Sequence, residues 1–92
     1  MPVTVRIPTP LRAVAKGNAN VQAKGDTIGD VIGDLEQQFP GLRERLVDET
    51  GELHRFINIY VNQEDIRFLD NQATALKDGD EVAIVPAIAG GR

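Results

Sequence analysis

The sequence predicts a two-layer α+β domain, in which one main helix crosses one face of a mixed sheet of four to five strands. The segments at 3–7, 55–62 and 81–88 alternate apolar and polar residues, as half-buried strands do. The segment at 27–39 repeats its apolar residues at helical spacing. The chain has 92 residues, of which 41% are hydrophobic and 26% charged. This composition is ordinary for one globular domain, which we expect to span residues 1–88, with a flexible tail at 89–92.

The strands follow from alternation and from the residues that interrupt it. Val3, Val5 and Ile7 alternate with polar residues, and Pro8 ends this segment because proline cannot donate a hydrogen bond to a sheet. The strongest strand signal runs from Arg55 to Asn62. We expect further strands at 21–23 and 81–88, and a short edge strand at 66–68.

The helix is predicted from Thr27 onward. Its apolar residues lie on one helical face: Ile28, Val31, Ile32, Leu35 and Phe39. Asp26 or Thr27 can cap its N-terminus, and Thr27 with Asp30 forms a variant of the capping box. Pro40-Gly41 ends the helix, and residues 42–47 have the pattern of one more helical turn.

Composition excludes several classes of function. Ten Lys and Arg against fourteen Asp and Glu give a net charge of −4, which is unfavourable for binding nucleic acid. The chain has no Cys and one His, so a disulfide framework, a cysteine nucleophile and most zinc sites are excluded, and we expect no metal. No apolar run is long enough to span a membrane, and the N-terminus does not have the profile of a signal peptide. We therefore expect a cytoplasmic protein that binds neither nucleic acid nor membranes.

Few residues are candidates for chemistry within the domain. His54 has no identifiable catalytic partner, and a strand-end histidine is the simpler interpretation. Phe56 and Tyr60 lie on the face of the strongest strand opposite Ile57 and Ile59. If the helix covers the latter face, Phe56 and Tyr60 are open to solvent and are candidate partner-binding residues.

The C-terminal residues Ala89, Gly90 and Gly91 directly follow the last apolar strand. Glycines often mark disordered ends, so the pair is weak evidence by itself. A glycine carboxylate is unhindered, however, and glycine adopts backbone angles that are closed to other residues. These properties suit a carboxylate that another enzyme must reach in a narrow channel.

The C-terminal third carries a family signature. It comprises Asp78-Gly79-Asp80-Glu81-Val82-Ala83, then Pro86 and Gly90-Gly91, and it resembles the ubiquitin-like sulfur carriers. This family includes the small subunit of molybdopterin synthase and the thiamine-pathway carrier. Within it, His54-Arg55-Phe56, Asn58-Ile59-Tyr60-Val61-Asn62 and Pro86-Ala87 are most similar to the branch that serves cysteine biosynthesis.

The resemblance implies a β-grasp fold and a carrier that is not itself an enzyme. A ubiquitin-activating-type enzyme would adenylate the Gly91 carboxylate with ATP, and sulfur transfer would convert it to a thiocarboxylate. In the cysteine branch, a pyridoxal-phosphate-dependent cysteine synthase accepts the sulfur, and a metalloprotease releases cysteine from the carrier. The carrier chain itself binds none of these cofactors.

One residue departs from the family pattern, since active carriers end in Gly-Gly and here Arg92 follows. With Arg92 attached, Gly91 has no free carboxylate, so we infer a precursor from which Arg92 must be removed. Three alternatives remain open: a small subunit of molybdopterin synthase, a protein modifier conjugated through Gly91, and an interaction module that is never activated.

Overall fold

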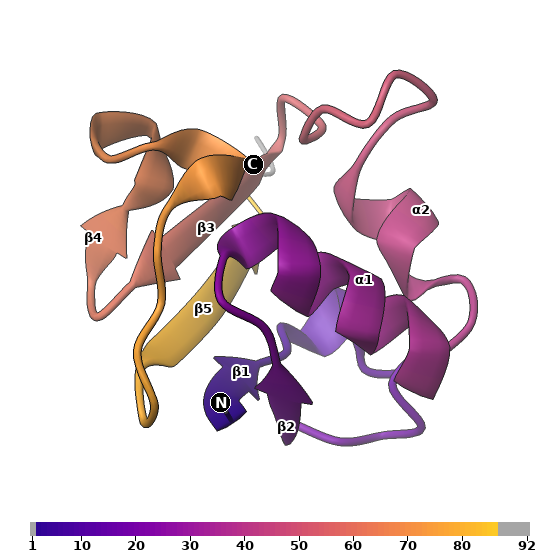
Figure 1. The fold of residues 1–92 in the computed structure, drawn as a ribbon. Coiled ribbons are helices and arrows are strands. Elements are labelled where there is room, and N and C mark those ends of the chain that lie inside the picture. Colours follow the sequence, from indigo (N-terminus) through magenta and orange to yellow (C-terminus); the bar gives the residue numbers. More distant parts are fainter. Residues whose placement is uncertain (1, 87–92) are drawn as a thin grey trace.

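The computed structural model describes residues 2–86, and the tail expected at 89–92 lies outside them. Five strands and two α-helices make up this part of the chain (Figure 1). The elements are β1 (Pro2–Arg6), β2 (Asn20–Lys24), α1 (Ile28–Gln38), α2 (Leu42–Leu46), β3 (Ile57–Val61), β4 (Glu64–Asp65) and β5 (Glu81–Pro86). Three short 3₁₀ helices, η1 to η3, lie at Thr9–Leu11, Ile66–Phe68 and Asn71–Ala73.

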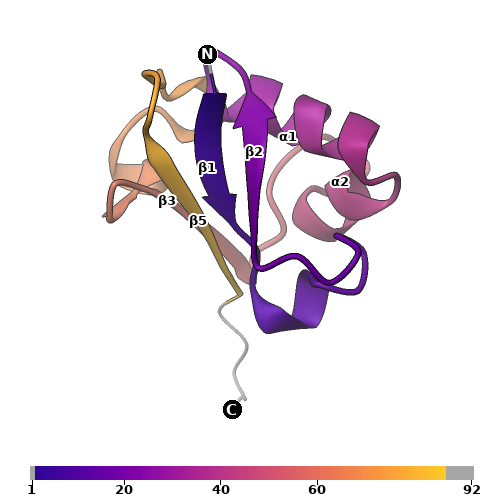
Figure 2. The same ribbon diagram turned by 90° about the horizontal axis from the view of Figure 1, so that it is seen from below.

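The strands form one mixed sheet in the order β2-β1-β5-β3-β4. β1 and β5 are parallel, and the other neighbouring pairs are antiparallel. α1 and α2 lie on the same side of this sheet (Figures 1 and 2). The predicted fold class is therefore confirmed, and the arrangement is the β-grasp. β5, the last strand of the described residues, lies in the middle of the sheet.

α1 begins and packs as its sequence predicts. Thr27 is the N-cap, and its hydroxyl oxygen accepts a hydrogen bond from the Asp30 N–H at 3.2 Å. The predicted apolar face is buried against the sheet: Ile28, Val31, Ile32, Leu35 and, after the helix ends, Phe39. From the sheet, alternate residues of β1, β3 and β5 meet this face, among them Val5, Ile59 and Val82.

The second helical turn depends on a contact that the sequence did not reveal. The Glu36 carboxylate accepts hydrogen bonds from the backbone N–H groups of Gly41 and Arg43, at 3.1 and 2.9 Å. These donors, Arg43 first, hold the pKa of Glu36 below its usual range. The carboxylate thereby satisfies amides at the start of α2 that no helical partner satisfies.

The prediction of an edge strand at 66–68 is wrong. β4 lies earlier, at Glu64–Asp65, and Ile66–Phe68 forms η2. Asn62 and Gln63 both have positive φ, 50° and 75°, which gives a two-residue hairpin turn and brings β4 directly after β3. The Asp65 side chain then accepts a hydrogen bond from the Arg67 N–H at 2.9 Å and caps η2. Ile66 is buried by the resulting turn.

The other strand boundaries differ by a few residues from those expected. β3 begins at Ile57 rather than Arg55, because the Ile57 N–H donates to the His54 carbonyl at 3.0 Å in a turn. β5 is described to Pro86, and the expected strand residues 87 and 88 lie outside the described part of the chain.

Candidate functional site

The end of β5, which we call the root of the C-terminal tail, belongs to a strand that pairs with β1 on one side and β3 on the other. Val82 of β5 pairs with Val5 of β1, and Pro86 lies opposite Ile57 of β3. Figure 2 shows β5 ending at one pole of the domain, beside the segment that follows β1. The tail therefore starts from a fixed position. Ala89, Gly90, Gly91 and Arg92 themselves lie outside the described residues.

The face of the sheet opposite the helices is the second part of the site. Strand alternation places Tyr60 and Asn58 of β3 on this outer face, next to Ala83 and Val85 of β5. Tyr60 is half-buried rather than fully open to solvent, and Val85 is 41% exposed. Tyr60, Ala83 and Val85 thus form an apolar strip on the outer face, with Asn58 beside it, and the strip ends at Val85, directly before Pro86.

Arg67 lies beside this strip and is held by two acceptors. Its Nε and Nη2 atoms donate to the Asp65 carboxylate, at 3.3 and 2.9 Å, and Nη2 also donates to Oδ1 of Asn58. The hydrogen bonds from the Arg67 side chain hold the pKa of Asp65 below its usual range. Arg67 therefore keeps a fixed place at the margin of the outer face, although it is exposed.

Phe56 does not share the outer face with Tyr60, so the prediction that the two form one exposed strand face is wrong. Phe56 precedes β3, and its ring stacks on His54 with centroids 5.1 Å apart and an interplanar angle of 7°. His54 in turn places Nε2 3.0 Å from the Glu44 carbonyl of α2. Phe56 thus belongs to the loop before β3, where it is 53% exposed.

His54 contacts the Phe56 ring and the backbone of α2. After the hydrogen bonds from Thr50, the charge of His54 also contributes to holding the pKa of Asp48 below its usual range. The structural interpretation of His54 stays a prediction. Among residues 2–86, no group of three or more His, Asp or Glu side chains is placed to hold a metal ion.

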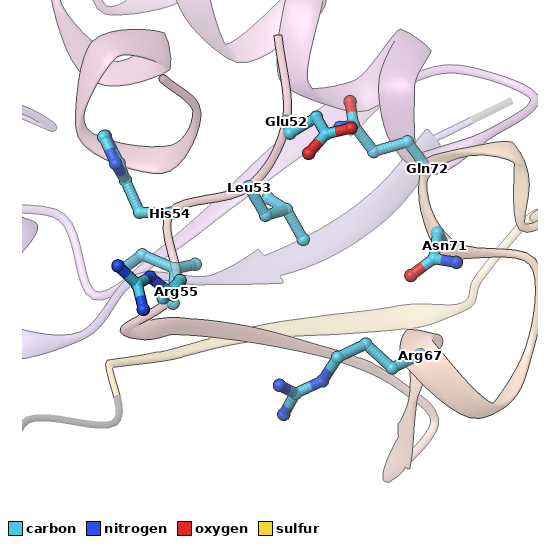
Figure 3. A pocket seen from close by; sticks show the side chains of 8 residues that line it. Glu52, Leu53, His54, Arg55, Arg67, Asn71 and Gln72 are labelled. Atoms are coloured by element: carbon cyan, nitrogen blue, oxygen red, sulfur yellow. The ribbon is translucent and has the colours of Figure 1, made fainter. Parts of the chain in front are cut away.

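A pocket of about 500 Å³ lies beside the start of β3 (Figure 3). It is lined by Glu52, Leu53, His54, Arg55, Ile57, Arg67, Asn71 and Gln72. Gln72 Nε2 donates to the Gly51 carbonyl at 2.8 Å and thereby joins the loop before β3 to η3. The residues that line it include no Ser, Thr or Cys, and Glu52 and His54 are the acid–base groups among them.

Two residues of the outer face were missed by the sequence analysis. Val85 had a usable signal, since it alternates with the core residues Val82 and Ile84 and must face away from them. Arg67 had no such signal, because its position depends on where the hairpin turn places Asp65 opposite Tyr60.

The fold defines a class of protein: a β-grasp domain in which β5, the last described strand, is the central strand of the sheet. The comparisons agree with this class. Residues 5–91 match the model of the ThiS family, so this chain belongs to that family.

Three relatives show how close the similarity is. The chain is 57% identical to the sulfur carrier protein CysO of Mycobacterium tuberculosis, over 99% of this chain and 100% of the relative. The crystal structure of that CysO covers 94% of this chain and 99% of its own, with a TM-score of 0.89 at 56% identity. The BexX/CysO complex of Amycolatopsis orientalis matches with a TM-score of 0.91 at 50% identity, over 97% of this chain and 99% of the other. Small archaeal modifier protein 3 of Haloferax volcanii is 43% identical over 71% of this chain and 70% of its own.

Among residues 2–86, neither α1 nor α2 has the length and apolar character needed to cross a bilayer.

Proposed function

We propose that this protein carries sulfur as a thiocarboxylate on Gly91 and delivers it for cysteine biosynthesis in the cytoplasm. The observation that carries the proposal is the 57% identity to CysO along the full length of both chains. The Gly90-Gly91 pair supports it, because it follows the central strand of the sheet and has no Cβ to obstruct a narrow channel.

The chemistry proceeds in two substitutions on a partner enzyme. Once Arg92 has been removed, an oxygen of the Gly91 carboxylate attacks the α-phosphate of ATP, and pyrophosphate leaves. A sulfur nucleophile at the oxidation level of sulfide then attacks the carbonyl carbon of the acyl adenylate. The new C–S bond replaces the C–O bond to phosphate, and AMP leaves. ATP is bound by the activating enzyme, and this chain supplies the carboxylate and the surface that positions it.

The partners follow from this assignment. They are a ubiquitin-activating-type enzyme, a pyridoxal-phosphate-dependent cysteine synthase, and a metalloprotease that trims the tail or releases cysteine. Pro86-Ala87 favours the cysteine synthase over the large subunit of molybdopterin synthase, whose small subunits usually have Pro-Pro there.

The intact mass of the protein isolated from its native cells tests the proposal. We expect loss of Arg92, and in part of the population the mass increase that accompanies replacement of one oxygen by sulfur. Treatment with a thiol-specific alkylating reagent should modify this population alone, because the chain has no Cys. A uniform mass that retains Arg92 under all growth conditions would contradict the proposal.

A second function is favoured by the similarity to small archaeal modifier protein 3. In this role the activated Gly91 carbonyl is attacked by a lysine amine of a target protein, which forms an isopeptide bond. Both roles use the same acyl adenylate, so one chain can serve both. Denaturing blots of native cells distinguish them, since the modifier role requires conjugates of higher mass.

The outer face provides a second prediction, since Val85 lies where the tail begins. We expect Val85→Asp to weaken binding to the activating enzyme by about tenfold or more, because burying an unpaired carboxylate at an interface costs on the order of 1–3 kcal/mol. Gln22→Glu is the matched control, with the same change in charge on the same face but on β2, two strands away. Calorimetric titration of the two variants measures the difference, and equal affinities would show that the outer face beside the tail is not a contact surface.

A further inference from the structure

β2 is an edge strand of the sheet, with five residues and β1 as its one neighbour. The Thr4 N–H donates to the Asp80 carbonyl at 3.0 Å, so the backbone of Thr4 faces away from Gln22, its partner in β2. Because hydrogen-bonded and non-hydrogen-bonded pairs alternate along a ladder, the N–H and C=O groups of Asn20, Gln22 and Lys24 point away from β1. These groups form the outward edge of β2.

Two side chains of α1 occupy part of this edge. The Lys24 N–H donates to Oδ2 of Asp34 at 3.0 Å. Nε2 of Gln38 donates to the Gln22 carbonyl at 2.8 Å and to Oδ2 of Asp34 at 2.9 Å. Asp34 and Gln38 are four residues apart, so they lie on one face of α1. Figure 2 shows β2 at the margin of the sheet, and α1 contacts it there. We call the side chains of Asp34 and Gln38 the edge cap.

The other edge of the sheet is closed in a different way. β4 has only two residues, and the Asp65 carboxylate accepts a hydrogen bond from the Arg67 N–H at 2.9 Å where the chain turns into η2. A strand this short offers few backbone groups to a second strand. Within residues 2–86, β2 is therefore the sheet edge that is long enough for pairing with another chain.

The free edge of β2 is complementary to a second copy of itself. In an antiparallel pair around a two-fold axis at Gln22, each Asn20 lies opposite Lys24 of the other copy, so the two lysines do not face each other. Such a pair needs hydrogen bonds between the two Gln22 residues and between each Asn20 and Lys24. The edge cap occupies the Gln22 carbonyl and the Lys24 N–H. It therefore blocks both central bonds and one bond in each outer pair.

We propose that the edge cap keeps this protein monomeric, because it denies the edge of β2 to a second copy of the chain. Unpaired groups along an edge strand are a template for association between sheets, and natural proteins cover such edges. Here the cover consists of a carboxylate and an amide that bond to each other and to the strand. The inference does not depend on the proposed function, so its test needs no partner enzyme.

Sedimentation equilibrium of the full chain tests this proposal. Asp34→Ala with Gln38→Ala removes the edge cap, and Asp30→Ala with Gln37→Ala is the matched control, with the same residue types at exposed positions of α1. We expect the parent and the control to be monomeric. The association constant of the cap variant should rise at least about tenfold above the parent's limit, because each copy gains two free edge groups. A dimeric parent, or equal association of the cap variant and the control, would overturn the proposal.

The substitution Gln22→Pro distinguishes edge pairing from association caused by partial unfolding. The Gln22 N–H points outward, so proline at this position removes a donor that the pair needs while the ladder to β1 stays intact. Added to the cap variant, Gln22→Pro should restore the monomer. Dimers that persist after this substitution would show that another surface associates, contrary to the proposal.

Circular dichroism and thermal melting establish whether each variant folds. If the double variant does not fold, Gln38→Ala alone is compared with Gln37→Ala. Gln38→Ala frees the Gln22 carbonyl, while Asp34 keeps its hydrogen bond from the Lys24 N–H. We expect the folded Gln38→Ala chain to associate more strongly than the Gln37→Ala chain, and equal association would overturn the edge cap.

Discussion

Removal of Arg92 should switch ATP–pyrophosphate exchange by the activating enzyme from background to full activity. While Arg92 is attached, the carbonyl carbon of Gly91 is part of a peptide bond, so it has no carboxylate oxygen to attack the α-phosphate. The carboxylate of Arg92 does not replace it, because it lies one residue further along and its residue carries a Cβ and a long charged side chain. We therefore expect the chain that retains Arg92 to give no more ATP–pyrophosphate exchange than the enzyme gives without any carrier.

Three purified chains make this measurement specific. One ends at Gly91, one retains Arg92, and one ends at Ala89. The chain ending at Ala89 keeps the whole predicted domain and a free carboxylate, so it distinguishes the need for the two glycines from the need for any free terminus. Equal exchange with the first two chains would contradict the precursor interpretation. It would also show that the enzyme accepts a terminus other than glycine.

The second large effect that we expect is that of a core substitution on the free energy of unfolding. Ile59 lies in the middle of β3 with 1% of its surface exposed, and it packs in the core that α1 covers. We expect Ile59→Ala to lower the free energy of unfolding by about 2–5 kcal/mol, from the lost apolar burial and the cavity that remains. A domain of this size has a total stability on the order of 5–15 kcal/mol, so the loss is a large fraction.

Urea denaturation of the two chains measures this change. Val85→Ala serves as the control, because Val85 lies on the neighbouring strand but faces solvent, and surface substitutions usually change stability by less than about 0.5 kcal/mol. Similar losses for the two variants would mean that the two faces of the sheet contribute equally, contrary to the packing described above.

Local sequence patterns predicted most of the fold, because they report directly on which face of an element is buried. The spacing of Ile28, Val31, Ile32 and Leu35 predicted α1 and its orientation, and Thr27 predicted its start. The edge strand was misplaced for a physical reason. An Asn62-Gln63 turn with two positive φ angles is unusual without glycine, so the alternation at 66–68 favoured a strand where the chain forms η2.

For the candidate site, too, some features could be predicted from the sequence and others depend on the tertiary structure. The prediction of a functional terminus came from the sequence alone: Gly90-Gly91 after an apolar strand, the peptide bond from Gly91 to Arg92, and the absence of Cys. These depend on covalent structure and residue chemistry, which need no folding to be known.

Only the tertiary structure decided which residues flank β5. Strand order places β5 between β1 and β3 and so brings Val5 and Ile57, far apart in the chain, to its two sides. It also separates Phe56 from Tyr60, because a turn at His54 delays the start of β3. Such neighbours depend on sheet pairing between distant segments, and pairing is settled by the packing of the whole core rather than by local periodicity.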